Sequence, residues 1–190
     1  MPTDGEVTEE RGSSDVVNRP IVLVGLMGAG KTAVGRRLAR ALGCRFVDAD
    51  ERIVAEAGLS IPEIFELYGE AAFRDFERRV VLRLLEEEPG VLALGGGAFL
   101  DPAIRRAVKS RARSVWLRAD LDTLVARTAR RPGTRPLLMR GDPRAILAAL
   151  MERRYPVYAE ADITVETGDG PIGEVVAQVL DALARSGRER

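Results

Sequence analysis

Residues 25–32 read Gly-Leu-Met-Gly-Ala-Gly-Lys-Thr and match the phosphate-loop pattern Gly-x-x-x-x-Gly-Lys-Ser/Thr at every fixed position. The β-branched apolar run at 21–24 before them predicts a buried strand. Four apolar residues after them are spaced like one face of a helix that should end at Gly43: Val34, Leu38, Ala41 and Leu42. Strand, glycine loop and helix together aim backbone N–H groups and a helix N-terminus at phosphate oxygens. The sequence therefore predicts a nucleotide site.

Two side chains of the loop have defined expected roles. Lys31 should reach the β- and γ-phosphates, and the Thr32 hydroxyl should ligate Mg²⁺. Of the 29 basic residues only Lys31 and Lys109 are lysines, so this chain uses arginine almost everywhere else. A compact ammonium suits the loop better than a planar guanidinium, which strengthens the assignment of Lys31.

Composition limits the classes of protein to consider. The 190 residues suit a single domain, with 29 acidic and 29 basic residues that leave no net field to favour nucleic acid or an anionic membrane. The chain has no histidine, which excludes histidine-based catalysis, and its one cysteine, Cys44, permits no internal disulfide. We therefore expect a cytoplasmic protein.

The two ends of the chain differ in character from the rest. Residues 1–19 are polar and acidic and lack the apolar region of a secretory signal, so we expect a disordered leader. No apolar run approaches the length of a membrane span. A single domain at 20–186 and a short tail at 187–190 complete the expected organisation.

Strands alternate with helices along the domain, which predicts a parallel sheet covered by helices on both faces. The further expected strands, all short and apolar, lie at 45–47, 91–94, 114–117 and 163–165. The expected helices lie at about 61–67, 70–86, from 102, 120–130, 143–154 and from 172. Ligands of such sheets bind beyond the carboxyl ends of the strands, where the phosphate loop, Asp48, Asp50 and residues 95–97 should converge.

Asp48 and Asp50 allow two interpretations. Asp50 can cap the helix that begins at Glu51, or one carboxylate can serve Mg²⁺ through water while the other orients a substrate hydroxyl. The third strand ends in Gly95, where many phosphate-loop proteins place a metal-binding acid. Asp48 is therefore the expected supplier of the metal carboxylate.

Three other features leave alternatives open. Residues 95–97 are all glycine, which indicates either a tight turn or a backbone surface for a small ligand. The Arg-, Pro- and Gly-rich stretch 131–140 is either a solvated loop or a lid. Arg74 and Glu77 have the spacing of an ordinary pair on a helix surface.

These elements together closely resemble the shikimate kinase family. The resemblance covers about residues 19–185 and rests on the following segments, in order: 25–32, Asp48-Ala49-Asp50, Phe73-Arg74, Gly95-Gly96-Gly97, Thr134-Arg135-Pro136-Leu137-Leu138 and Arg154 before Tyr155-Pro156. It implies a three-layer α/β/α phosphate-loop kinase fold with a five-stranded parallel sheet in the order 2-3-1-4-5. It also implies that about 129–142 form a lid. We expect the chain to be a monomer, although nothing in the sequence specifies an oligomeric state.

The resemblance further implies transfer of the ATP γ-phosphate to the 3-hydroxyl of shikimate in aromatic amino acid biosynthesis. It assigns shikimate to Asp50, Arg74, Gly96 and Arg154. It assigns ATP to Gly28, Ala29, Gly30, Lys31, Thr32, Ala33, Arg127, Arg135 and Pro171. Lys31, Asp50 and Arg135 would be the catalytic residues. Mg²⁺ would be held by Thr32 and, through water, by Asp48.

Two departures concern the nucleotide. Ala33 stands where many family members carry a second hydroxyl, so a contact to the α-phosphate is missing. Residues 167–170 lack the basic residue that often precedes the adenine-side proline.

Two other functions remain as alternatives to shikimate phosphorylation. They are a kinase of another polyol acid such as gluconate, and an inactive ligand-sensing module. A GTP-binding switch is excluded because the only asparagine, Asn18, lies in the leader, so no guanine-reading Asn-Lys-x-Asp motif exists.

Overall fold

The structure, a computed structural model, describes residues 19–87, 90–130, 138 and 141–188. Its centre is a sheet of five parallel strands in the order β2-β3-β1-β4-β5. The strands are β1 (Ile21–Val24), β2 (Arg45–Asp48), β3 (Gly90–Ala93), β4 (Arg113–Arg118) and β5 (Ile163–Glu166). The expected fold and strand order are confirmed.

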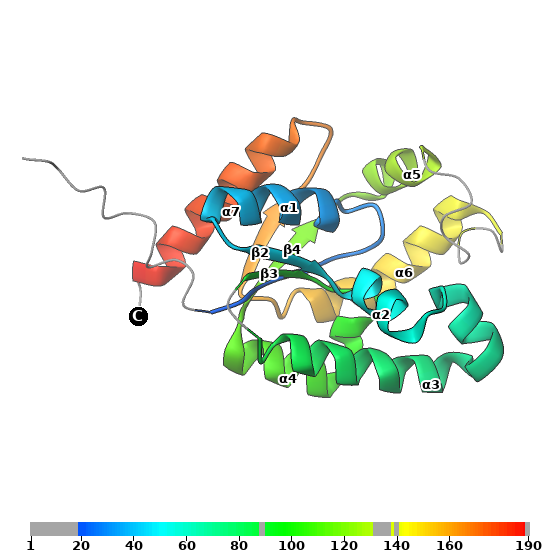
Figure 1. Ribbon diagram of the computed structural model, residues 1–190. Coiled ribbons are helices and arrows are strands. Elements are labelled where there is room, and N and C mark those ends of the chain that lie inside the picture. Colours follow the sequence, from blue (N-terminus) through cyan, green and yellow to red (C-terminus); the bar gives the residue numbers. More distant parts are fainter. Residues whose placement is uncertain (1–18, 88–89, 131–137, 139–140, 189–190) are drawn as a thin grey trace, which may run out of the picture.

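Helices cover both faces of the sheet (Figure 1). Helices α1 (Lys31–Leu42) and α7 (Ile172–Arg188) pack together on one face, while α3 (Ile61–Leu84) and α4 (Pro102–Arg111) pack together on the other. The remaining elements are α2 (Ala49–Ala57), the short 3-10 helix η2 (Ala98–Leu100), α5 (Leu121–Ala129) and α6 (Pro143–Tyr158). This is the three-layer arrangement that the alternation of strands and helices predicted.

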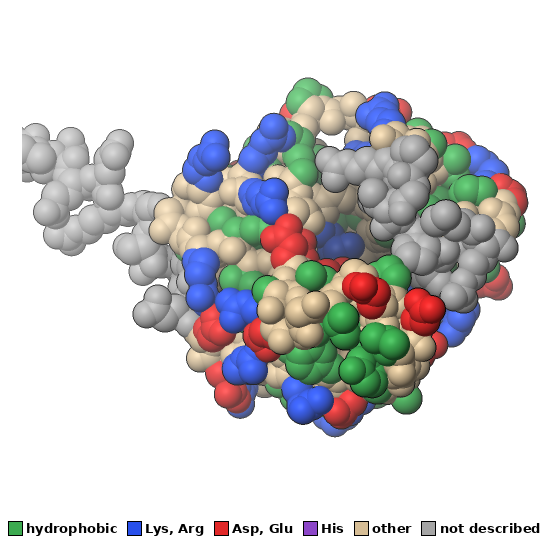
Figure 2. Space-filling model, turned by 45° about the vertical axis from the view of Figure 1, so that its right-hand side comes forward, with side chains coloured by type: hydrophobic (Ala, Val, Ile, Leu, Met, Phe, Trp, Pro, Cys, Tyr) green, Lys and Arg blue, Asp and Glu red, His purple; other side chains and the backbone are tan. Residues whose placement is uncertain are grey.

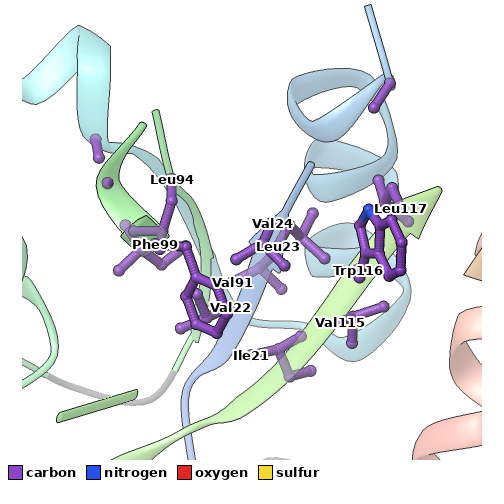
Figure 3. Packing of buried hydrophobic residues seen from close by; sticks show 14 of the residues in the cluster. Ile21, Val22, Leu23, Val24, Val91, Leu94, Phe99, Val115, Trp116 and Leu117 are labelled. Atoms are coloured by element: carbon purple, nitrogen blue, oxygen red, sulfur yellow. The ribbon is translucent and has the colours of Figure 1, made fainter. Parts of the chain in front are cut away.

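Strand β1 lies at the middle of the core. Its four side chains are at most 1% exposed, and they pack between β3 and β4 (Figure 3). The expected absence of polar alternation holds for β1 and β3 but not for the edge strand β5, where Thr164 and Glu166 face solvent. At this edge of the sheet Ile163 and Val165 face the core, while the side chains between and after them lie in solvent.

The buried face of α1 differs from expectation at two positions. Val34 and Leu38 are buried as predicted, but Ala41 is exposed and Leu42 only partly buried, while Gly35 and Ala39 are buried. A Cβ on Gly35 would lie 2.4 Å from a ring carbon of Phe46, so helix and strand approach closely at a residue without a side chain. The helix ends at Gly43 in the left-handed conformation, as predicted.

One helix runs further than the sequence suggested. The two helices expected at 61–67 and from 70 are both present within α3, and they meet at a kink at Gly69, a non-helical residue with φ 80° and ψ 172°. Helix α6 continues through Pro156 to Tyr158 instead of ending at Arg154. Proline removes one helical hydrogen bond and crowds the preceding turn, but the last turn is held by Tyr155 and Tyr158, which both pack on Trp116. The extension brings Tyr158 to the site.

Two expected segments lie outside the described residues. They are the leader, apart from Arg19, and most of the expected lid at 129–142, including Arg135. Across the helices that the structure describes, none combines the length and apolar character that a membrane crossing requires.

Candidate active site

The carboxyl ends of β1, β2 and β3 converge at one edge of the sheet, as predicted for a parallel sheet. This end of the molecule is hollowed, with Lys and Arg side chains inside the hollow and Asp and Glu side chains at its margin (Figure 2). The phosphate loop follows β1, Asp48 ends β2, and residues 95–97 follow β3. Helices α3 and α6 add side chains from the neighbouring layer.

The phosphate loop has the backbone that its glycines permit. Gly28 and Gly30 have φ angles of 85° and 96°, which residues with side chains rarely adopt. Gly30 is the N-cap of α1, so the loop leads directly into a helix N-terminus. Lys31 Nζ donates to the carbonyl oxygens of Gly25 at 2.7 Å and Leu26 at 3.1 Å, which holds the ammonium over the loop.

Asp48 connects the loop to β2 and α2. The Thr32 hydroxyl donates to Asp48 Oδ2 at 2.8 Å, while Asp48 Oδ1 accepts from the backbone N–H groups of Asp50 and Glu51. Asp48 is therefore the N-cap of α2. The interpretation of Asp50 as the cap is wrong, because the helix begins at Ala49, one residue before it.

The oxygen atoms of Thr32 and Asp48 fit Mg²⁺. The ion prefers oxygen ligands, keeps several of its waters and takes only one or two groups from a protein. A hydroxyl and a carboxylate already 2.8 Å apart beside the phosphate loop suit that requirement. Within the described ranges, no group of three His, Cys, Asp or Glu side chains forms a fuller metal site.

Asp50 and Glu77 place two carboxyl groups around Gly95. A Cβ on Gly95 would lie 2.5 Å from Asp50 Oδ1 and 3.0 Å from Glu77 Oε1. Burial raises the pKa of Asp50 and the nearby charge of Asp48 adds to the rise, while Lys31 and Arg74 oppose it. Burial likewise raises the pKa of Glu77 against the opposing charge of Arg74.

Arg74 and Arg154 reach neighbouring glycines of the 95–97 run from different helices. Arg74 Nη1 donates to Glu77 Oε2 at 2.7 Å, and the Arg74 guanidinium lies against Gly97. Arg154 Nη1 donates to the carbonyl oxygen of Gly96 at 2.9 Å. The two arginines expected to bind one ligand thus meet at one loop.

Arg127 lies on the other side of the phosphate loop. Its Nη1 donates to the carbonyl oxygens of Gly28 and Ala29 and to the Thr167 hydroxyl, and its Nη2 donates to the Gly168 carbonyl. Arg127 therefore links the phosphate loop to the segment between β5 and α7, which contains Pro171.

Two residues of this site were missed by the sequence reasoning. Glu77 is 2% exposed, so the interpretation of Arg74 and Glu77 as a surface pair is wrong for Glu77. A signal was present: Phe73, Glu77 and Val80 share one face of α3, so a carboxylate stands in an apolar stripe. Tyr158, also buried, donates from its hydroxyl to the Gly96 carbonyl and lies one turn after Arg154.

Comparison with known proteins gives consistent matches. The sequence model described as "Shikimate kinase" matches residues 27–184. A shikimate kinase of Paramagnetospirillum magneticum is 56% identical over 167 residues, which is 88% of this chain and 85% of that relative. The solved structure of shikimate kinase from Acinetobacter baumannii in complex with shikimate aligns with a TM-score of 0.86 at 38% identity, covering 92% of this chain and 98% of that one.

A gluconokinase from Sinorhizobium meliloti 1021 has the same fold at greater distance. It aligns with a TM-score of 0.60 at 21% identity, over 90% of this chain and 94% of that one. This likeness extends to the fold alone.

Proposed function

The chain belongs to the shikimate kinase family, and on that premise we propose that it transfers the γ-phosphate of ATP to the 3-hydroxyl of shikimate, giving shikimate 3-phosphate and ADP. ATP-dependent phosphorylation of shikimate, a step in aromatic amino acid biosynthesis, is the activity that this membership establishes. The assignment of particular residues rests on one observation: Arg74 and Arg154, from separate helices, both contact the glycine run beside Asp50.

Arg74 and Arg154 bind the shikimate carboxylate, and Gly96 also contacts shikimate. Guanidinium groups form paired, charge-assisted hydrogen bonds with a carboxylate, and two of them fix its orientation as well as its charge. Glu77 holds Arg74 in place at 2.7 Å. This clamp favours a carboxylic acid over a neutral polyol and places the ring next to Asp50.

Asp50 orients the reacting hydroxyl and accepts its proton. As the bond from the 3-oxygen to the γ-phosphorus forms and the bond to the β-phosphate oxygen breaks, the hydroxyl proton passes to the Asp50 carboxylate. A carboxyl with a raised pKa is a better proton acceptor than an ordinary exposed one, and burial raises the pKa of Asp50.

The nucleotide phosphates bind in the loop from Gly28 to Ala33. Backbone N–H groups and Lys31 hold the β- and γ-phosphates, and Lys31 stabilises the charge of the transferring group. Thr32 and, through water, Asp48 hold Mg²⁺, which neutralises phosphate charge when bound. Arg127 and Pro171 flank the adenine, and Arg135, outside the described residues, completes the catalytic set.

The surroundings of the enzyme follow from its surface and composition. We propose a cytoplasmic monomer whose partners are ATP and shikimate and which has no nucleic acid or membrane partner. The balance of 29 acidic and 29 basic residues supports the last point, because it gives no net field towards polyanions.

The test is ADP release from Mg-ATP with shikimate, with gluconate and without acceptor. We expect release with shikimate only, with strong loss in Asp50→Asn and Arg74→Ala. Arg79→Ala is the matched control, because Arg79 lies on the same helix with a side chain 68% exposed. Release with gluconate but not shikimate would overturn the substrate. ATP binding without release for either acceptor would favour the sensing module.

A further inference from the structure

The three consecutive glycines at 95–97 are not required by the shape of the backbone. The glycines with positive φ in the described part of the chain are Gly25, Gly28, Gly30, Gly43, Gly58 and Gly69. Gly97 has φ −102° and ψ −16°, which any residue can adopt. The reason for glycine after β3 must therefore lie in what surrounds the missing side chains.

Each missing side chain faces a different residue of the substrate site. A Cβ on Gly95 would lie 2.5 Å from Asp50 Oδ1, and a Cβ on Gly97 would lie 2.6 Å from Arg74 Nη1. A Cβ on Gly96 would lie 3.1 Å from Arg154 Nη1, a tight but milder contact. Atoms do not approach a real Cβ at 2.5 or 2.6 Å, so an alanine at 95 or 97 must displace the charged group beside it.

The atoms that face Gly95 and Gly97 are the far ends of side chains and not backbone. The Arg74 guanidinium can rotate away from residue 97 at small cost to the fold, and Asp50 can change its rotamer. Gly90, at the start of β3, offers a contrast, since its Cβ would lie 2.5 Å from the backbone carbonyl oxygen of Arg45. Crowding at residue 90 therefore strains the sheet, whereas crowding at 95 or 97 displaces site residues.

We propose that Gly95 and Gly97 are positioning residues for phosphoryl transfer, and that they are glycine because a side chain would push Asp50 and Arg74 out of place. The inference rests on the proposed roles of Asp50 and Arg74 and assigns one glycine to each. Gly97 lets Arg74 lie flat against the loop while it remains bonded to Glu77. Gly95 lets the Asp50 carboxylate approach the end of β3.

The experiment compares Gly95→Ala, Gly97→Ala and Gly90→Ala with the unaltered protein in steady-state kinetics and thermal unfolding. For Gly97→Ala we expect the shikimate KM to rise about tenfold or more, the effect of losing one hydrogen bond to a charged group, with ATP KM and kcat little changed. For Gly95→Ala we expect kcat to fall about tenfold or more, because Asp50 is the proton acceptor. Gly90→Ala should lower the Tm without changing either KM.

A double substitution separates positioning from a general structural effect. In an Arg74→Ala background the group that Gly97 accommodates is gone, so Gly97→Ala should add no further rise in shikimate KM. Equal rises in both backgrounds, or an unchanged shikimate KM in Gly97→Ala alone, would overturn the inference. An unaltered protein inactive towards shikimate, or an Arg74→Ala variant with unchanged shikimate KM, would instead overturn the proposed function.

Discussion

Asp50 is held where its charged form is costly to the fold. Because burial raises its pKa in the folded protein, the folded state binds this proton more tightly than the unfolded state does. The stability contributed by the protonated group is fully present below the unfolded pKa and is lost as the pH rises through the folded pKa. At neutral pH the ionised carboxylate therefore weakens the fold that it serves.

Asp50→Asn should raise the Tm at pH 7–8 while nearly abolishing shikimate phosphorylation. The gain in Tm should shrink as the pH falls towards about 4, where the unfolded carboxyl itself becomes protonated. Thermal unfolding across that pH range is the measurement. Asp75→Asn, at an acid whose side chain is 59% exposed, should leave the Tm nearly unchanged at each pH. A lower Tm for Asp50→Asn at pH 8 would contradict the argument.

Tyr158→Phe should raise the shikimate KM and leave kcat and the ATP KM unchanged. The substitution removes the hydroxyl that holds the Gly96 carbonyl together with Arg154. Loss of one neutral hydrogen bond costs about 0.5–1.5 kcal/mol, so the expected rise is about two- to tenfold.

Tyr155→Phe is the matched control for Tyr158→Phe. Tyr155 lies on the same helix and packs on Trp116, but its hydroxyl donates to the Ala119 carbonyl at 2.5 Å. We expect it to change the Tm and not the shikimate KM. Equal changes in KM for the two variants would mean that loss of either hydroxyl disturbs α6 in general, and would contradict a specific role of the Tyr158 bond to Gly96.

The candidate site residues that the sequence predicted are identified by local motifs or by the family pattern, whereas the two that it missed are identified by their contacts in the fold. Lys31 and Thr32 stand at fixed positions of a motif, and Arg74 and Arg154 follow from a family pattern. Glu77 and Tyr158 are defined by burial and by contact with the 95–97 loop, which depend on helices α3 and α6 packing beside β3. Neither local spacing nor composition contains that information.

Asp48 connects helix α2 to the phosphate loop through the two oxygens of one side chain. One oxygen caps α2 through the N–H groups of Asp50 and Glu51, and the other accepts from Thr32 in the phosphate loop. The cap fixes the start of α2 and thereby the position of Asp50 in its first turn. A single carboxylate thus sets both the proposed metal side and the proposed substrate side of the site.

Asp48→Asn should separate these two tasks. Asparagine caps a helix about as well as aspartate, so the Tm should stay within about 2 °C of the unaltered protein. The charge near Mg²⁺ is lost, so the Mg²⁺ concentration for half-maximal activity should rise several-fold. Asp48→Ala removes the cap as well, at about 1 kcal/mol, and should lower the Tm by about 2–4 °C. An unchanged Mg²⁺ requirement in Asp48→Asn would exclude Asp48 from the metal site.

The boundaries of the elements were less predictable than their existence. Gly69 separates the two helical stretches of α3, as the sequence predicted, whereas Pro156 lies inside α6 and not after it. In α6, packing of Tyr155 and Tyr158 on Trp116 outweighs the low helix propensity of proline. The capping box of Ser60 and Glu63 was predictable because both its bonds are local.

For the whole molecule, alternation of strands and helices predicted a parallel sheet, but the strand order came from the family resemblance. The local sequence pattern does not predict which strands are neighbours. In the sheet, β3 and β2 lie on one side of β1, and β4 and β5 lie on the other. That order brings Asp48 and the glycine run next to the phosphate loop, although 64 residues separate Lys31 from Gly95. The site is therefore a property of the complete sheet and not of any one motif.

Because the proposed nucleotide and shikimate sites lie on one folded unit, each ligand should stabilise the whole domain independently. A ligand at about 100 times its Kd adds about 2.7 kcal/mol to the free energy of unfolding. For a domain of this size that corresponds to a rise in Tm of about 5–11 °C. Thermal unfolding with shikimate and with Mg-ADP, each added alone, measures both shifts. Arg74→Ala should lose the shikimate shift and keep the Mg-ADP shift, since Arg74 lies at the glycine run and not at the phosphate loop. Loss of both shifts would mean that the substitution disturbs the whole fold, and would contradict the assignment of Arg74 to the shikimate site.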